Sequence, residues 1–140
     1  METPGFFTEN FLPTVVSGYT AAGTSPITAT GVDCAGFDGV VFFAQLSVAN
    51  DNNYLTAGFA AQDSGYTPNT SARVVSGTAP SNEFVVLDIL RPSSRWVNAI
   101  MTLGTSSAIY GIWAIRYRAR SLPVAVAVSG TEGVTQYAAG

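Results

Sequence analysis

Residues Glu83–Val124 read E-F-V-V-L-D-I-L-R-P-S-S-R-W-V-N-A-I-M-T-L-G-T-S-S-A-I-Y-G-I-W-A-I-R-Y-R-A-R-S-L-P-V, and this stretch decides the fold. It contains three long apolar runs, separated by the short polar breaks Pro92-Ser93-Ser94 and Gly104-Thr105-Ser106-Ser107. Apolar runs between breaks rich in Gly, Pro and Ser are typical of β-strands joined by turns. The sequence therefore predicts a β-meander, in which each run pairs with the next.

Both sides of the first expected strand pair are largely apolar. One side carries the apolar pairs Ile89 with Val97, Leu87 with Ala99 and Val85 with Met101. The other side carries Leu90 with Trp96, Val86 with Ile100 and one polar pair, Asp88 with Asn98. A strand that is apolar on both sides has two surfaces to bury, whereas one small domain usually buries only one. Other molecules are therefore expected to cover the second side.

The composition supports the same expectation. The chain has 140 residues, which suits a single domain, and 47% of them are hydrophobic. Only 11% are charged, against about 25% in a typical soluble domain. Proteins with apolar patches and few charges tend to associate. We therefore expect a stable assembly rather than a free monomer.

The charges are unevenly distributed. There is no lysine or histidine, so six arginines carry all the positive charge, and all six lie at Arg73 or later. Most of the acidic residues lie before Arg73. This distribution suits complementary contacts between proteins. It does not suit nucleic-acid binding, which needs a denser basic field.

Apolar alternation predicts strands along the rest of the chain: Val15–Tyr19, Ile27–Val32, Val40–Ala49, Tyr54–Ala61, Ala72–Gly77, Ala108–Ala119 and Val124–Val128. Val40–Ala49 and Tyr54–Ala61 are expected to form a hairpin around an Asn-rich turn, and Gln62–Ser71 is expected to be a loop. About eight short strands without a helix predict an all-β fold, an antiparallel β-sandwich that is jelly-roll-like. The predicted division is an extended N-terminal arm at 1–14, the sandwich at 15–128 and a tail at 129–140.

In the expected strand Ala108–Ala119, strict alternation assigns one side to the core: Ile109, Gly111, Trp113, Ile115 and Tyr117. The opposite side then carries Tyr110, Ile112, Ala114, Arg116 and Arg118.

The sequence predicts no catalytic residues, no cofactor and no metal site. Without histidine or lysine, a Ser/His/Asp triad, a Schiff base and a phosphate-binding Gly-Lys motif are all excluded. The single cysteine, Cys34, allows no internal disulfide and is expected to be a buried thiol. Asp33 and Asp38 lie on either side of Gly36 and are interpreted as turn residues. No apolar run is long enough for a membrane-spanning helix, so we expect no membrane partner.

Several side chains are predicted to bind a partner. Phe6, Phe7 and Phe11 give the arm an aromatic character, and the arm either docks on its own domain or reaches a neighbouring subunit. Trp96 and Tyr110 lie on the second side, where a protein contact or a sugar would fit. Four arginines complete the set: Arg91, Arg95, Arg116 and Arg118. They pair either within the chain, with Asp88, Glu83 or Asp63, or across an interface.

The run from Leu87 to Val124 resembles a group of small tailed-bacteriophage virion proteins. The residues that carry the resemblance are Asp88, Arg91-Pro92, Arg95-Trp96-Val97, Gly104-Thr105, Gly111, Tyr117, Arg120 and Pro123, with a weaker match at Phe37-Asp38-Gly39. The resemblance covers roughly two thirds of the chain and leaves out the first 36 residues.

The resemblance implies a capsid decoration (cement) protein without enzymatic activity, located on the outer surface of the virion. Such a protein stabilises the head by bridging subunits of the major capsid protein, and the resemblance implies that it associates with itself as a homotrimer. Two alternatives remain open. One is a neck, tail or head-fibre component, and the other is a carbohydrate-binding β-sandwich that uses Trp96 and Tyr110.

Overall fold

The computed structural model describes residues 10–49, 52–75, 82–104 and 106–119. These residues form ten β-strands: β1 (Leu12–Ser17), β2 (Thr20–Gly23), β3 (Ile27–Thr28), β4 (Val32–Asp33), β5 (Phe37–Val48), β6 (Tyr54–Ala60), β7 (Thr67–Val75), β8 (Phe84–Leu90), β9 (Trp96–Thr102) and β10 (Ser107–Ala119). None of the described residues belongs to a helix that is long and apolar enough to cross a membrane.

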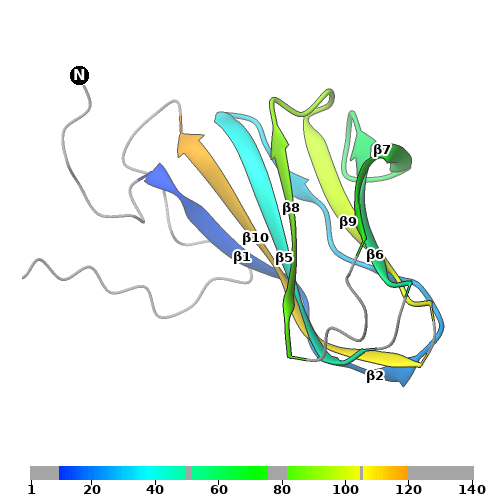
Figure 1. The fold of residues 1–140 in the computed structure, drawn as a ribbon. Coiled ribbons are helices and arrows are strands. Elements are labelled where there is room, and N and C mark those ends of the chain that lie inside the picture. The colour runs from blue at the N-terminus through cyan, green and yellow to red at the C-terminus, as the bar shows by residue number, and fades with distance from the viewer. Residues whose placement is uncertain (1–9, 50–51, 76–81, 105, 120–140) are drawn as a thin grey trace, which may run out of the picture.

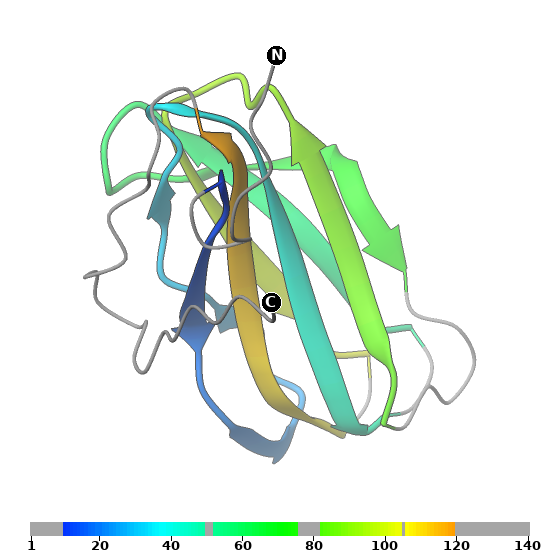
Figure 2. The same ribbon diagram turned by 90° about the vertical axis from the view of Figure 1, so that its left-hand side faces the viewer.

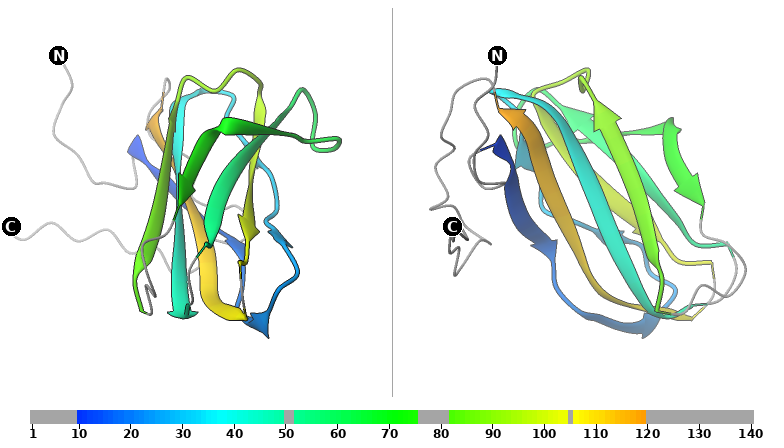
Figure 3. Two further views of the ribbon diagram at one scale, coloured as in Figure 1. Left: turned by 45° about the vertical axis from the view of Figure 1, so that its right-hand side comes forward. Right: turned by 60° about the vertical axis from the view of Figure 1, so that its left-hand side comes forward.

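The strands form two antiparallel sheets that pack face to face (Figures 1 and 3). Sheet A has the order β1-β10-β5-β8, with β2 also paired to β10. Sheet B has the order β3-β9-β6-β7, with β4 also paired to β9. The predicted all-β antiparallel sandwich is therefore confirmed.

The strand pairs are nested within one another. β1 pairs with β10, β3 and β4 pair with β9, β5 pairs with β8, and β6 pairs with β7. The chain thus folds as one long antiparallel ribbon whose tip is the connection between β6 and β7. Successive pairs of this ribbon alternate between sheet A and sheet B.

This alternation contradicts the predicted meander and the predicted hairpin. β8 and β10 lie in sheet A while β9 lies in sheet B, so the three strands do not pair in succession. β5 and β6 likewise lie in different sheets. The physical reason is that the apolar sides of consecutive strands face each other across the core instead of lying side by side in one sheet. Arg91, which follows β8, has φ of 52°, and this left-handed conformation marks the place where the chain leaves sheet A.

The core lies between the sheets, and the predicted inward sides of β8 and β9 are confirmed. Many of the buried apolar side chains come from four strands: Val40, Phe42, Ala44 and Leu46 of β5, Leu55 and Ala57 of β6, Val85 and Leu87 of β8, and Val97, Ala99 and Met101 of β9. Cys34 is buried, as predicted, and burial raises the pKa of its thiol to about 12.

The predicted inward side of β10 is wrong beyond Ile109. Ile109 pairs with Leu46 and Gly111 pairs with Gln45, so Tyr110 is an extra residue that forms a β-bulge. Beyond the bulge the two sides exchange. Ile112 and Ala114 are fully buried, whereas Trp113 and its alternate neighbours Ile115 and Tyr117 point away from the core.

Three boundaries also differ from prediction. β1 begins at Leu12, so the last residues of the expected arm belong to the sandwich. β7 begins at Thr67, inside the segment that was expected to be a loop. The expected strand Val124–Val128 and the tail at 129–140 lie outside the described residues.

Candidate interaction surface

The outward side of sheet A is lined by apolar side chains from all four of its long strands. Figure 2 views this side from outside, with β1, β10, β5 and β8 in that order. Because opposite residues of antiparallel strands lie on the same side, the pairing register defines rows across the sheet. One row joins Val15, Trp113, Phe43 and Val86. We call this side the outer face of sheet A.

Much of the outer face of sheet A is accessible to solvent. Phe84 is 55% exposed, Leu90 54% and Val86 42%, and all three belong to β8. On the opposite edge of the sheet, Val15 is 47% exposed. The sequence predicts a second apolar side on this strand that needs to be covered, and Phe84, Val86 and Leu90 form that side.

Three aromatic rings form the centre of this face. The ring of Phe84 lies edge-on to that of Phe43, with centroids 6.1 Å apart, and 5.9 Å from the ring of Trp113 at a tilt of 58°. Aromatic pairs prefer such edge-to-face geometry. The three side chains come from the different strands β8, β5 and β10 and form one aromatic patch, in which Phe84 contacts the other two rings.

A shallow pocket of about 330 Å³ lies beside the aromatic patch. It is lined by Phe11, Val41, Phe43, Asp88, Ile115 and Tyr117. The hydroxyl of Tyr117 donates a 2.6 Å hydrogen bond to Oδ1 of Asp88. Burial, followed by this bond to Asp88, raises the pKa of Tyr117 to about 12. The lining of the pocket is therefore mostly apolar and includes one hydrogen-bonded polar pair, Tyr117 and Asp88.

Gly39 allows Tyr117 to lie over β5. A Cβ atom at Gly39 would lie 2.3 Å from the phenol ring of Tyr117, which is closer than real contacts allow. The weaker match of the phage resemblance at Phe37-Asp38-Gly39 therefore coincides with a position where the structure needs glycine.

The outward side of sheet B is different in character. Asn98 of β9 and Thr56 of β6 point outward there, yet they are only 2% and 4% exposed. Tyr66 lies against this side, since a Cβ atom at Gly58 would be 3.3 Å from the Cβ of Tyr66 and 2.3 Å from Oδ1 of Asn98. The middle of this side of sheet B, around Asn98 and Thr56, is thus polar and covered by its own chain, whereas the outer face of sheet A is largely apolar and exposed.

The predicted arginines are partly used inside the molecule. Arg95 donates from Nε and from an Nη atom to the two carboxylate oxygens of Asp33, at 2.9 Å and 2.7 Å. This hydrogen bond with Arg95 lowers the pKa of Asp33. Asp33 also accepts the N–H of Ala35 at 3.0 Å, which confirms its interpretation as a turn residue. The partner of Arg95 was not among the acids that the sequence analysis named.

Arg116 is also used internally. It donates at 2.9 Å to the backbone carbonyl of Asp33, and its guanidinium lies 5.3 Å from the ring centroid of Phe37. Burial lowers the pKa of Arg116. Arg118 is exposed and has φ of 51°, so the strand is irregular there. The predicted continuous row of Arg116 and Arg118 on one open side therefore does not form.

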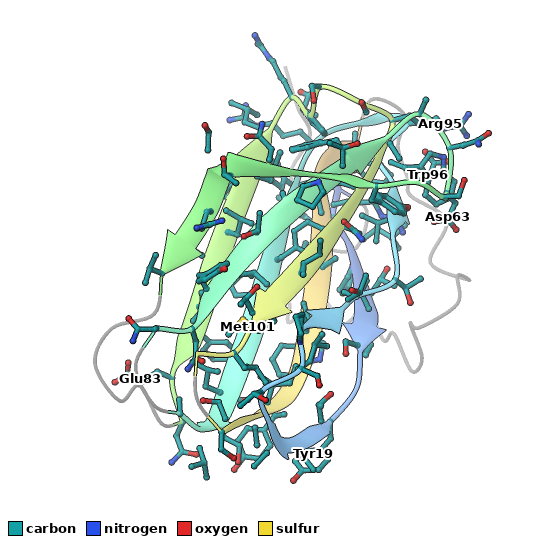
Figure 4. The ribbon with its side chains drawn as sticks, turned by 90° about the vertical axis from the view of Figure 1, so that its right-hand side faces the viewer. Tyr19, Asp63, Glu83, Arg95, Trp96 and Met101 are labelled. Carbon is teal, nitrogen blue, oxygen red and sulfur yellow. The ribbon has the colours of Figure 1, made fainter. Side chains whose placement is uncertain are left out.

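Arg91 and Arg95 do not face each other across a hairpin, because β8 and β9 lie in different sheets. Both still line a pocket of about 520 Å³ at one end of the sandwich, together with Ser93 and Ser94. Figure 4 shows Arg95 and Trp96 at this end.

Trp96 and Tyr110 are not brought together. Trp96 is half-buried in sheet B, whereas Tyr110 is 47% exposed at the bulge in sheet A. The two rings therefore do not form the shared sugar-stacking platform that the sequence allowed.

Of the three aromatics in the expected arm, Phe11 is half-buried and lines the pocket on the outer face of sheet A. Phe6 and Phe7 lie outside the described residues. Neither Phe43 nor Phe84 is predicted from the sequence to lie on the outer face, and strict alternation places Trp113 in the core. The glycine after Tyr110 is the one signal that indicates a bulge, since glycine inside a strand often marks one.

A search of protein-family models finds no match to this chain, and a search of curated proteins finds no significantly similar sequence. The function is therefore inferred from the outer face of sheet A and from the sequence.

Proposed function

We propose that this chain is a structural virion protein of a tailed bacteriophage, a capsid decoration (cement) protein without enzymatic activity. It binds the outer surface of the head and bridges subunits of the major capsid protein. The observation that carries this proposal is the outer face of sheet A, where Phe84, Val86 and Leu90 are exposed beside the half-buried rings of Phe43 and Trp113. Monomeric soluble proteins rarely expose a contiguous apolar patch of this kind without a partner.

The strand order supports the proposal. A ribbon of nested antiparallel pairs wrapped into two sheets, β1-β10-β5-β8 and β3-β9-β6-β7, is the arrangement we assign to a jelly roll. Jelly rolls are common in viral capsid proteins and in lectins. Fold alone does not define function. The strand order therefore supports the proposal, but the main evidence for it is the outer face of sheet A.

The proposed mechanism is burial of apolar surface at many equivalent places on one shell. Each contact contributes about 25 cal/mol per Å² of apolar surface removed from water. The aromatic patch supplies the kind of anchor that dominates protein interfaces, and the pocket beside it accepts an apolar side chain of the partner. The exposed Arg91 and Arg118 meet acidic groups of the capsid and fix its orientation.

Binding at many sites then resists the internal pressure of the genome through multivalency. The homotrimer implied by the resemblance stays a prediction. A neck, tail or head-fibre role would use the same surface but would place the protein at one vertex. Labelling of the particle distinguishes these two roles.

The test uses heads of the parent phage that have expanded without this protein. The wild-type chain is expected to bind across the shell and to raise the temperature at which the heads break. The double variant Phe84→Ser, Trp113→Ser is expected to lose binding at least tenfold. Val75→Ser is the matched control, because Val75 is 61% exposed on β7 of sheet B and lies away from the proposed surface.

Equal binding by the double variant and the control would overturn the proposal. A carbohydrate-binding role predicts a different pattern, in which glycan binding survives the double variant and disappears in Trp96→Ala.

A further inference from the structure

Strand β8 is the last strand of sheet A, so one side of its backbone has no partner strand among the described residues (Figures 2 and 3). The N–H of Leu46 donates to the carbonyl of Glu83, and the N–H of Arg91 donates to the carbonyl of Asp38. These two bonds lie at the two ends of the pairing between β5 and β8 and fix which residues bond to β5. The odd-numbered residues of β8 bond to β5, and the even-numbered ones direct their N–H and C=O groups to the free edge.

The residues at this free edge are Phe84, Val86, Asp88 and Leu90. Their side chains are the ones that lie on the outer face of sheet A. The same four residues thus present unpaired backbone groups and accessible, mostly apolar side chains.

Every other edge strand that the structure describes carries a feature that discourages pairing with another chain. β1 contains Pro13 and β7 contains Pro68, and proline removes a donor from a strand edge. β2, β3 and β4 have four, two and two residues, which is too short to template a partner strand.

β8 has none of these features. It reads F-V-V-L-D-I-L over seven residues, with no proline, glycine, lysine or arginine. Its one charge, Asp88, already accepts a hydrogen bond from Tyr117. Proteins that keep such an edge open without protection risk aggregation, so an unprotected edge indicates a partner strand in the native assembly.

We propose that β8 pairs antiparallel with β8 of a second copy of this chain, about a two-fold axis through Leu87. The two sheets A then become one continuous sheet across the pair. This mode of association is β-strand addition, in which backbone hydrogen bonds supply the contact.

The register follows from the sequence of β8. Leu87 is the middle residue of Phe84–Leu90, so an axis there pairs every free backbone group of one copy with the other. Phe84 then lies opposite Leu90 of the partner, and Val86 lies opposite Asp88 of the partner. An axis at Asp88 would instead set the two carboxylates directly opposite each other, and directly opposed like charges are destabilising. The Leu87 axis avoids that cost and continues the outer face of sheet A from one copy to the next.

A second copy fits this edge better than an unrelated extended peptide, because its own strand is symmetric in length about Leu87 and apolar at both ends. The pairing uses the edge of the sheet and does not depend on binding to a capsid. Alone it gives a dimer, and together with the three-fold contact of a homotrimer it gives a hexamer.

The test is the mass of the purified chain by sedimentation equilibrium, with Val86→Pro as the variant. Proline at 86 removes an N–H that points to the free edge and leaves the bonds to β5 intact. The variant is therefore expected to keep its circular dichroism spectrum and to have half the wild-type mass. Val86→Thr retains the N–H and is the matched control, with the wild-type mass expected. A wild-type monomer or trimer, or an unchanged mass in Val86→Pro, would overturn the pairing.

Amide hydrogen exchange on the wild-type chain gives a second measurement that does not depend on the folding of a variant. At a concentration where the assembly predominates, the amides of Phe84, Val86, Asp88 and Leu90 are expected to exchange as slowly as those of Val85 and Leu87. Dilution is expected to speed up exchange only at Phe84, Val86, Asp88 and Leu90. Fast exchange of that group at every concentration would contradict the proposal.

Discussion

The rings of Phe84 and Trp113 lie 5.9 Å apart on the outer face of sheet A, although their strands, β8 and β10, are separated by β5. Phe43 of β5 also contacts Phe84, so three strands are joined by aromatic contacts on the side away from the core. Aromatic contacts of this kind contribute modestly to stability but present a large, rigid area to a partner. This arrangement separates the residues that hold the fold from those that are available for binding.

Phe84 and Phe42 are expected to differ sharply in their effect on stability. Phe84→Ala removes a ring that is 55% exposed, and it should lower the free energy of unfolding by about 1 kcal/mol, the value of one or two aromatic contacts. Phe42 is fully buried, and Phe42→Ala should cost about 3–5 kcal/mol because it leaves a cavity. Urea unfolding monitored by circular dichroism measures both. Equal losses would mean that Phe84 belongs to the core.

The sequence predicts which side of most strands is buried, because alternation reports directly on burial. Leu87 of β8 and Ala99 of β9 point inward as their patterns indicate. Alternation does not report which strand lies beside which. Leu87 was assigned to Ala99 as a neighbour in one sheet, whereas it pairs with Phe42 of β5. Partner choice depends on long-range packing between the two layers, which no local pattern contains.

The sequence predicts that an apolar side of the sheet needs a partner, but it identifies few of the residues on that side. The second apolar side of Phe84–Leu90 is exposed as expected, and Phe11 lines the pocket beside it. Trp113 was assigned to the core because alternation was continued through the bulge at Tyr110. For Arg95 and Arg116 the sequence leaves internal pairing and interface pairing open, and in the structure both contact Asp33. Their contacts join residues far apart in the chain and could not be read from spacing.

The pairing of Asp33 with Arg95 predicts a loss of stability in acid. Because the hydrogen bond with Arg95 lowers the pKa of Asp33 below its ordinary value of 3.8, the unfolded chain binds this proton more readily than the folded one. The contribution of ionised Asp33 to the free energy of unfolding is therefore complete above the ordinary pKa. It is lost as the pH falls through the lower pKa of the folded state. Asp33→Asn should reduce stability at neutral pH and flatten the fall in stability at acidic pH, as measured by urea unfolding along a pH series.

Glu83→Gln is the control for this series, since it removes one negative charge from the exposed residue before β8. A pH profile that changes equally in both variants would show that net charge, and not the Asp33–Arg95 contact, controls acid stability.

Tyr117 predicts a loss of stability in alkali. Its folded pKa of about 12 lies above the ordinary value of 10, first because of burial and then because of Asp88. The contribution of protonated Tyr117 to the free energy of unfolding is complete below the ordinary pKa. It is lost as the pH rises through the pKa of the folded state. Tyr117→Phe should therefore show a smaller loss of stability across this interval than the wild type. Tyr66, whose pKa is also raised by burial and by Asp63, accounts for part of the loss that remains.

Tyr19→Phe is the matched control for the alkaline series, because Tyr19 is 66% exposed. If this variant and Tyr117→Phe lose stability alike, the contact of Tyr117 with Asp88 does not carry the effect.

Deletion of Tyr110 is expected to be tolerated, in contrast to other deletions in β10. Without Tyr110, Ile109 is followed directly by Gly111, and regular alternation places Ile109, Ile112 and Ala114 on the same side. These three are the residues that are buried in the bulged strand, so the deletion removes the bulge and leaves both sides of the sheet unchanged. Because Tyr110 is 47% exposed and its hydrogen bond to Asn82 is long at 3.5 Å, the loss of stability should stay near the usual surface range of about 0.5 kcal/mol.

Deletion of Trp113 is the matched comparison. It would turn Ala114 outward and Ile115 inward without a bulge to absorb the change, because a shift of one residue moves a strand's side chains to the opposite face. That variant should lose the near-ultraviolet circular dichroism of the native fold, whereas the variant lacking Tyr110 should keep it. If both deletions unfold the chain, the bulge is required for pairing with β5; if both fold, alternation in β10 does not decide which side is buried. Either outcome would contradict the inference that the bulge at Tyr110 places Trp113 on the outer face of sheet A.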